Sequence, residues 1–552
     1  MTSLRHRMRR MRGTPVIAIG IALSRLTGLL RTAIVVNIFG VTRLGDAFAA
    51  AMRIPNVIQN LLGEGALSAS FIPEYSKLKE EDEAAAGVLA GAIASFLLLV
   101  ASLLALIGVV FARPVTRAIT WGWSGEQLDT TVNLVRILSI GAGFLVLSAW
   151  CLGVLNSHRR FFLSYVAPVL WNATQIAVLL TVGLLAWDLV DRATALAWAV
   201  VAGGVVQVAV QIPAVRRANT SISLNAGWNE TSARKVIGRL GPAVLGRGAL
   251  QISAFLDLAL ASLLAAGATT AIASSQPLYI LPISIIAMSV AAAELPELST
   301  LTDQREVLRR TSERVARVMF LITLIVVIYL VAGDHVVWGV FSFGGLVQRL
   351  DSDEILLIAF VLGTFSLGLP AIGGSRQLQN VLYAVGDTRT PARISFTRVC
   401  VSFTFGIIAM FQLDRLVIHK GEVTGFSALV APLGPLAKAL RDNDDVPLRL
   451  GAVGLAAGAA MGAWLEYALL KQATQPADGT QRPRSATVRQ QLSPVLAAMT
   501  VAIVLRTFVP LGPRLIESIV VGVATIVVYM AVGVLTGHPT ATMLADRFTR
   551  KT

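Results

Sequence analysis

The chain has 552 residues, of which 55% are hydrophobic and 14% are charged, and its mean hydropathy is +0.70. A soluble domain carries about 25% charged residues, so this composition excludes an ordinary soluble protein and indicates an integral membrane protein. The formal net charge of +15 raises the question of a nucleic-acid partner, which depends on how the basic residues are distributed.

Fourteen apolar stretches are long enough to cross a membrane, since a hydrocarbon core of about 30 Å requires about 20 apolar residues per helix. The segment before the first stretch contains five arginines. That stretch is full length and lacks an Ala-x-Ala cleavage site, so we expect a retained helix rather than a signal peptide. The stretches are centred near residues 27, 60, 98, 143, 175, 203, 250, 280, 323, 368, 401, 460, 501 and 525.

The first two stretches contain three arginines, Arg25, Arg31 and Arg53. A charged side chain at the centre of a membrane helix costs about 2.5–3.5 kcal/mol on insertion scales and normally faces a bundle interior or a watery cavity. Arg25 and Arg31 are six residues apart, so on an ideal helix they need not share one face. Cations retained at this depth predict a protein that handles an anionic group within the membrane.

The second stretch also contains a proline, in the sequence Arg53-Ile54-Pro55-Asn56. Proline removes a backbone hydrogen bond and allows a kink, which we expect to be a bending point, with Asn56 satisfying the freed carbonyl group. Glu64 lies between two glycines and suits either a structural partner for an arginine or a coupling-ion site.

The basic residues alternate in number from one connecting segment to the next. With the N-terminus in the cytoplasm, 29 lysines and arginines fall inside, 12 outside and 6 within the stretches. This pattern follows the positive-inside rule and predicts that both termini are cytoplasmic. The charge is therefore an orientation signal, and we expect no nucleic-acid partner.

Short motifs repeat at an offset of about 225 residues. Pro73-Glu74 recurs as Pro296-Glu297, and Gly13-Thr14-Pro15 is similar to Leu240-Gly241-Pro242. The offset joins the first stretch to the seventh, so both copies have the same orientation, as in transporters that bind substrate between two halves. We expect an N-terminal lobe over residues 1–215, a C-terminal lobe over 230–472 with an external insertion at 414–450, a cytoplasmic linker at 473–490, and two further helices with a tail at 491–552.

The twelfth stretch carries Gly454, Gly458 and Gly462 at intervals of four residues, which predicts close helix packing. Asp257 and Glu466 also lie within stretches, with no partner assigned by the sequence.

Sequence motifs for catalysis and for cofactor binding are absent. The chain contains no Gly-x-x-x-x-Gly-Lys, Gly-x-Gly-x-x-Gly, His-Glu-x-x-His or Cys-x-x-Cys motif. Its two cysteines, Cys151 and Cys400, are far apart, and its five histidines are scattered. We therefore expect no catalytic residue, no metal site and no cofactor, and transport driven by a gradient or by metabolic flow.

The N-terminal third contains a series of specific motifs. They are Ser24-Arg25-Leu26-Thr27-Gly28-Leu29-Leu30-Arg31, Gly45-Asp46-Ala47-Phe48, Arg53-Ile54-Pro55-Asn56 and Gly63-Glu64-Gly65-Ala66-Leu67-Ser68. Later motifs include Ala167-Pro168-Val169-Leu170-Trp171-Asn172, Gly241-Pro242-Ala243 and Gly386-Asp387-Thr388-Arg389-Thr390. With these motifs the chain resembles the MurJ (MviN) family of bacterial lipid II flippases, in the MOP exporter superfamily.

The resemblance implies an all-α polytopic fold with two six-helix lobes around a cationic cavity, and two C-terminal helices that form a groove for a polyprenyl tail. It implies substrate-binding roles for Arg25, Arg31, Asp46, Arg53, Asn56, Glu64 and Arg376. Gln59 and Pro277 stand where the family usually has basic residues, and Thr32 where it often has an acid; Arg247 is a candidate replacement for the lost charge.

Each arginine of the first stretch has two interpretations. Arg25 and Arg31 either bind the diphosphate, for which the forked guanidinium is well suited, or Arg25 pairs with Asp46 or Glu64 while Arg31 reaches outward to the membrane surface.

The sequence as a whole predicts a flippase of the bacterial inner membrane that moves lipid II to the outer leaflet, in contact with membrane lipids and cell-wall synthesis proteins. The alternatives are an exporter of another polyprenyl-linked glycan or an amphipathic substrate, and a non-transporting scaffold for cell-wall synthesis.

Overall fold

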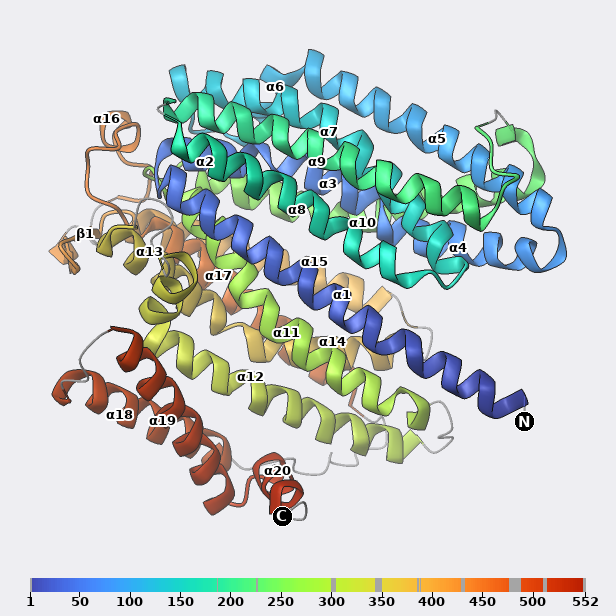
Figure 1. Ribbon diagram of the computed structural model, residues 1–552. Helices are drawn as coiled ribbons and strands as arrows, with labels where there is room; N and C mark the ends of the chain where they lie inside the picture. The colour runs from blue at the N-terminus through green and yellow to red at the C-terminus, as the bar shows by residue number, and fades with distance from the viewer. Residues whose placement is uncertain are drawn as a thin grey trace. The chain divides into compact units, whose positions relative to one another are not determined.

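The computed structural model describes residues 2–185, 187–224, 227–298, 304–342, 350–384, 387, 389–427, 432–475, 488–509 and 514–549. These residues are almost all helical and form two compact units, divided between Leu263 and Leu264 (Figure 1). The predicted all-α polytopic fold is confirmed. Most of the predicted linker, residues 476–487, lies outside the described residues.

The first unit contains eleven described helical elements. They are α1 (Thr2–Phe39), α2 (Arg43–Ala51), α3 (Arg53–Leu62), α4 (Glu64–Glu81), α5 (Glu83–Val110), α6 (Ala112–Ile119), α7 (Gly125–Ser157), α8 (Phe161–Leu184), α9 (Leu189–Ala218), the short 3-10 helix η1 (Gly227–Asn229) and α10 (Thr231–Ala261). Helix α10 packs on α3 and α4, and Lys235 of α10 pairs with Glu74 of α4 at 2.6 Å.

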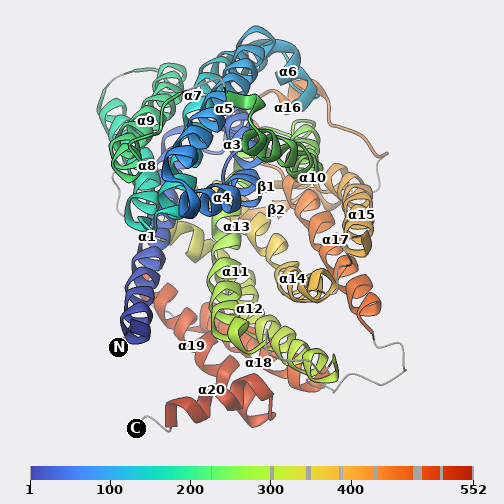
Figure 2. The same ribbon diagram turned by 90° about the vertical axis from the view of Figure 1, so that its right-hand side faces the viewer.

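The second unit is also helical, with one small hairpin. Its elements are α11 (Ala268–Leu298), α12 (Gln304–Phe341), α13 (Ser352–Ser366), α14 (Leu369–Ala384), α15 (Arg389–Leu413), β1 (Val417–His419), β2 (Glu422–Thr424), α16 (Lys438–Arg441), α17 (Gly451–Ala473), α18 (Val488–Phe508), α19 (Arg514–Leu535) and α20 (Pro539–Thr549). Helices α15 and α17 lie side by side, and α18 packs against α19 (Figure 2).

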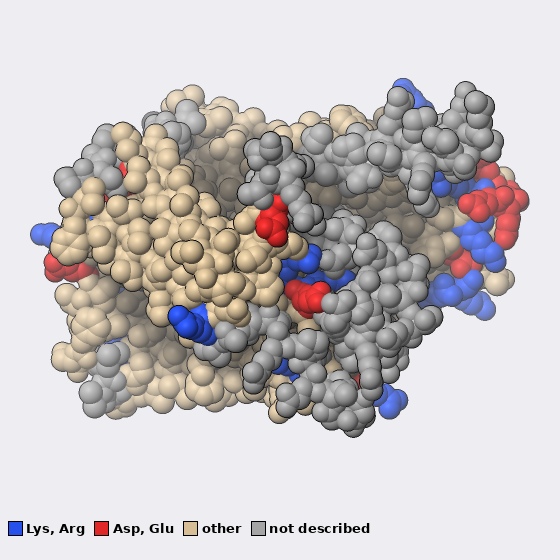
Figure 3. Space-filling model, turned by 90° about the horizontal axis from the view of Figure 1, so that it is seen from below, with Lys and Arg blue, Asp and Glu red and all other residues tan. Residues whose placement is uncertain are grey.

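Eleven helical segments of the described chain are long and apolar enough to cross a membrane, and they coincide with eleven of the fourteen predicted stretches. The stretches centred near residues 250 and 280 form α10 and α11, each of 31 residues. Most of the described side chains on the face in Figure 3 are uncharged, and the charged ones form small groups. A surface of this kind suits lipid rather than water.

We expected the stretch centred near residue 60 to form one bent helix. The structure divides it into three helices, α2, α3 and α4. Helix α2 ends at Ala51 because Pro55 has no N–H to donate to the Ala51 carbonyl group four residues earlier. Helix α3 ends at Gly63, whose backbone is non-helical (φ −85°, ψ −134°). The side chain of Asn56 is exposed and makes no hydrogen bond with another described residue, so it does not satisfy the freed carbonyl.

Residues 414–450 fold partly into an antiparallel hairpin in which Ile418 pairs with Val423. Its turn uses Lys420 and Gly421, both with positive φ (51° and 81°). Asp414 anchors the segment: its carboxylate accepts a hydrogen bond from the Ala265 N–H, and Arg449 donates to its backbone carbonyl at 3.2 Å. Burial raises the pKa of Asp414 to about 7, despite the nearby arginines, which favour the charged form.

The glycines of α17 confirm the predicted close packing. A Cβ built at Gly458 would lie 2.5 Å from the Ser402 carbonyl oxygen of α15, and one at Gly454 would meet the backbone of Met410. Because glycine has no side chain, α15 and α17 can approach closely at both positions, and no room remains there for a larger residue.

Candidate substrate-binding residues and lipid groove

Arg25 of α1 has no described protein partner. Its side chain is exposed and makes no hydrogen bond or ion pair with another described residue. The alternative interpretation, a structural pair between Arg25 and Asp46, is not found: Asp46 is 98% buried on α2 and not bonded to Arg25. The side chain of Glu64, the other proposed partner, lies outside the described residues.

Arg31 points to a neighbouring helix instead of reaching outward to the membrane surface. Its guanidinium lies over the ring of Trp171 of α8, 5.0 Å from the ring centroid. Its Nη1 donates to Oε1 of Gln175, also on α8, at 3.4 Å. Both contacts are with neutral groups, and no acidic side chain in the described part of the chain pairs with Arg31.

The two partners of Arg31 are themselves held in place. Gln175 donates from Nε2 to the Trp171 carbonyl oxygen at 3.0 Å, and the Trp171 indole N–H donates to the Val200 carbonyl oxygen of α9 at 3.1 Å. Asn172 donates to the Thr27 hydroxyl oxygen of α1 at 3.2 Å, which ties α8 to the same part of α1.

Sequence reasoning missed Gln175 and noted Trp171 only as part of a motif. A signal was present, because Trp171, Asn172 and Gln175 occur at positions i, i+1 and i+4 and so lie on one side of α8. What the sequence did not show is that this side of α8 meets α1.

The other predicted binding residues are placed as follows. Asp46 lies in the first turn of α2, which Thr42 caps by accepting from the Gly45 N–H. Arg53 begins α3 and is half-buried, and Asn56 is exposed on the same helix. The side chain of Arg247, on α10, lies outside the described residues. Arg376 is in the second unit, on α14, where it is exposed and bonded to no described residue.

In the second unit, Glu466 of α17 has the partners that the sequence did not assign. Only 3% of its side chain is exposed, and Arg398 of α15 donates to its Oε2 at 2.8 Å. Gln379 of α14 and Ser395 of α15 donate to its Oε1 at 3.1 and 3.0 Å. This carboxylate therefore neutralises Arg398 and joins three helices.

A pocket of about 730 Å³ also lies within the second unit. It is lined by α12, α13, α14, α17, α18, α19 and the start of α20, and almost all of its surface is apolar. Its lining includes Phe320, Val327, Leu330, Leu367, Met461, Trp464, Leu492, Val495, Tyr529 and His538. A volume and lining of this kind suit a hydrocarbon chain.

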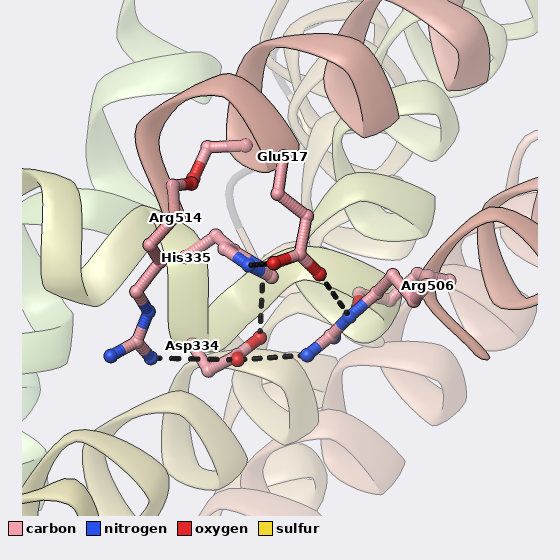
Figure 4. Close-up of polar contacts among 7 residues, drawn as sticks. Asp334, His335, Arg506, Arg514 and Glu517 are labelled. Carbon is pink, nitrogen blue, oxygen red and sulfur yellow. Dashed lines mark hydrogen bonds and ion pairs between the residues drawn. The ribbon is translucent and has the colours of Figure 1, made fainter. Parts of the chain in front are cut away.

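A group of charged residues joins the α18–α19 hairpin to α12 (Figure 4). His335 of α12 lies between Asp334 and Glu517, with nitrogen–oxygen distances of 3.5 and 3.4 Å. Arg506 of α18 pairs with Asp334 at 2.9 Å, and Arg514 of α19 approaches the same carboxylate at 3.7 Å. Helices α18 and α19, which contribute to the pocket lining, are thereby attached to α12, which also lines it.

Tyr529 of α19 and the uncharged His538 form a second attachment to α12, at Phe320. The Tyr529 hydroxyl donates to the Phe320 carbonyl oxygen at 2.9 Å, and the His538 ring stacks on Phe320 with 4.0 Å between centroids. Burial lowers the pKa of His538 to about 4, so its ring is neutral near pH 7. Its Nδ1 accepts from the Thr540 N–H, which leaves the proton on Nε2. This part of the pocket lining therefore has no charge.

Among the described residues, no group of three or more His, Cys, Asp or Glu side chains is arranged to hold a metal ion.

Comparisons with known proteins agree with one another. The model of a family described as "Lipid II flippase MurJ" matches residues 35–433. A lipid II flippase MurJ of Burkholderia cenocepacia is 29% identical over 423 residues, which cover 75% of this chain and 78% of that protein. A probable lipid II flippase MurJ of Rickettsia prowazekii is 25% identical over 403 residues, covering 72% of this chain and 78% of that protein.

Two solved structures share the fold. A lipid II flippase MurJ in an inward closed conformation has a TM-score of 0.71 and 18% identity, covering 94% of this chain and 98% of that one. An inward-facing multidrug resistance MATE transporter of the MOP superfamily has a TM-score of 0.56 and 16% identity, covering 83% and 100%.

Proposed function

Because the chain belongs to the lipid II flippase MurJ family, we propose that it moves lipid II from the inner to the outer leaflet of the bacterial cytoplasmic membrane. It would do so by alternating access, without covalent chemistry and without a cofactor. A related exporter of another polyprenyl-linked glycan and a non-transporting scaffold are the alternatives that a rescue experiment separates from this role.

One observation carries the proposal beyond family membership: Arg31 is a cation in a membrane-spanning helix with only neutral partners in the described chain. A guanidinium has five N–H donors in a fixed fork that matches phosphate oxygens. A charge at this depth requires compensation, and a diphosphate headgroup would supply it. Arg25, exposed on the same helix and bonded to no described residue, would be the first phosphate contact.

The remaining predicted residues would complete the headgroup site. Arg53, Arg247 and Arg376 would add positive charge, and Asp46, Asn56 and Glu64 would contact sugar or peptide groups or orient the arginines. All of these assignments except Arg247 rest on matched family motifs. Arg247 is proposed only as a replacement for the positive charge missing at Gln59 and Pro277.

The polyprenyl tail would occupy the 730 Å³ pocket of the second unit. Its lining is apolar, and its histidine is neutral, so no charge opposes the entry of a hydrocarbon chain. The lobes would span residues 1–215 and 230–472. Both termini would be cytoplasmic, as the basic connecting segments favour. Proteins of cell-wall synthesis are the partners that this role implies.

The test is rescue of bacteria depleted of their own lipid II flippase. Expression of this chain should restore growth and the appearance of lipid II in the outer leaflet. Arg25→Ala should reach normal membrane levels and fail to rescue. The control is Arg136→Ala: Arg136 is an exposed arginine of α7 that contacts only Asn133 among the described residues, and its loss should leave rescue intact.

The alternatives give different results. A non-transporting scaffold would fail to restore growth in the depleted strain, for the wild-type chain as well as for Arg25→Ala, because it does not move lipid II. An exporter of another glycan would leave lipid II in the inner leaflet despite normal expression.

A further inference from the structure

We propose that Gln175 and Trp171 are positioning residues that hold Arg31 as an unneutralised cation for the oxyanion of an isoprenoid diphosphate. This inference rests on the proposed function and assigns roles to two α8 residues that the headgroup site did not include. It explains why a buried amide, and not a carboxylate, faces Arg31.

The contacts of Arg31 leave most of its hydrogen-bonding capacity unused. Its one hydrogen bond to a described residue is the 3.4 Å contact with Gln175, which is long for this kind of bond. The indole of Trp171 covers a face of the guanidinium, and a cation–π contact restrains the plane without consuming a donor. The edge of the fork therefore keeps donors for an incoming oxyanion.

The orientation of the Gln175 amide follows from its second hydrogen bond. Its Nε2 donates to the Trp171 carbonyl oxygen, so Oε1 is the atom directed to Arg31. Only 1% of the surface of Gln175 is exposed, so its amide cannot turn toward solvent. It offers Arg31 an acceptor but no negative charge. A glutamate would keep the acceptor, lose the bond to Trp171 and neutralise the cation.

Trp171 is fixed from the other side by α9. Its indole N–H donates to Val200, and a Cβ built at Gly203 would lie 2.9 Å from the Trp171 ring. Val200 and Gly203 therefore hold the indole in place, and the Arg31 guanidinium lies over the indole ring. The polar contacts run in one chain from α9 through α8 to α1.

The experiment measures binding of farnesyl diphosphate and of farnesol to the purified full-length protein in detergent. The two probes share the isoprenoid chain and differ in the diphosphate. Arg31→Gln and Gln175→Glu should each weaken farnesyl diphosphate binding by about tenfold or more, the loss of one charged hydrogen bond. Neither variant should change farnesol binding by more than about twofold.

Further variants separate charge from shape. Gln175→Leu, which removes the acceptor without adding charge, should weaken diphosphate binding by only about threefold, and Trp171→Leu by about fivefold through loss of the cation–π contact. The control Thr220→Glu adds a negative charge at an exposed position outside the membrane-spanning helices and should bind both probes normally.

Thermal stability distinguishes positioning from a purely structural role. Gln175→Glu should be at least as stable as the wild type, because the new carboxylate pairs with Arg31. Normal farnesyl diphosphate binding by Gln175→Glu would overturn the inference, and so would an equal loss of farnesol binding. In either case, a wild-type protein that binds the diphosphate and rescues depleted cells would leave the proposed function standing. A wild-type protein that binds no farnesyl diphosphate would overturn both.

Discussion

Two membrane-embedded arginines of this protein have opposite surroundings. Arg31, in the first unit, contacts an indole ring and an amide oxygen, both neutral. Arg398, in the second unit, pairs at 2.8 Å with the buried carboxylate of Glu466, which two further side chains also bind. Both arginines look alike in a hydropathy profile, as a basic residue within an apolar stretch.

The difference separates an arginine available to a ligand from one that stabilises the fold. An ion pair satisfies both charges, and removing either partner leaves the other buried and uncompensated. Replacing a cation that has only neutral partners should cost less stability, because no opposite charge is left buried and uncompensated. Mutations at the two sites should therefore have contrasting effects on stability and on transport. The expected loss of stability is largest where helix packing around Arg398 is disrupted and smallest at Arg31.

The largest loss of stability is expected from Gly458→Leu, which should separate α15 from α17 and so pull Arg398 away from Glu466. A Cβ at this position would already clash with backbone atoms of Ser402 and Gly406. Backbone atoms cannot relieve a clash by a change of rotamer. We expect a loss of about 4 kcal/mol or more, above the usual range for overpacking, seen as little folded protein in the membrane. Gly183→Leu on α8 is the control, since no atom lies within 4 Å of its Cβ. Equal yields of the two variants would contradict the packing.

Glu466→Ala should destabilise the protein by about 3 kcal/mol, the lower end of the range for breaking a buried pair, because a third of the Arg398 side chain is exposed. The measurement is the thermal midpoint in detergent. Glu81→Gln, at an exposed pair with Lys77, should cost less than about 0.5 kcal/mol and serves as the control. Equal thermal midpoints for the two variants would show that the Arg398–Glu466 pair contributes no more stability than an exposed ion pair.

The pKa of Asp414, at the end of α15, tests whether burial, which raises it, outweighs the nearby arginines, which lower it. Its folded pKa of about 7 lies above the usual value of 3.8, so the protonated form stabilises the fold. That contribution is present at low pH and is lost as the pH rises through 7, a decrease of about 2 kcal/mol between pH 5.5 and pH 8. Melting curves across this range should show a falling midpoint that flattens in Asp414→Asn. An unchanged slope in the variant would assign the pH dependence to other groups.

Arg31→Ala should have the smallest effect on stability, about 1 kcal/mol, the lower end of the range for leaving a buried acceptor without a donor, because the bond that Gln175 loses is long and no charge is left uncompensated. Lipid II transport should nevertheless be lost in the depletion strain. The matched variant is Arg398→Ala, which should reduce stability because Glu466 remains buried. A loss of stability in Arg31→Ala as great as that in Arg398→Ala would remove the distinction between the two sites.

The amino-acid sequence determined the class of fold, because hydropathy is a local property that depends on about 20 consecutive residues. Eleven predicted stretches match membrane-spanning helices, and the α17 glycines predicted a close contact that the structure contains. The sequence also identified Arg31 as an unusual cation, since a charge within an apolar stretch can be recognised without knowing its neighbours in space and is costly in a membrane unless it is compensated.

Only the tertiary structure decided which helix faces meet, and through them the partner of each charge. Gln175 is 144 residues from Arg31, and Arg398 is 68 residues from Glu466, so no local pattern joins either pair. The break between α2 and α3 follows from Pro55 in the sequence, whereas the break between α3 and α4 depends on the non-helical backbone of Gly63. Contact between side chains depends on how helices pack, and the pattern of apolar residues along one helix does not specify which helix lies against it.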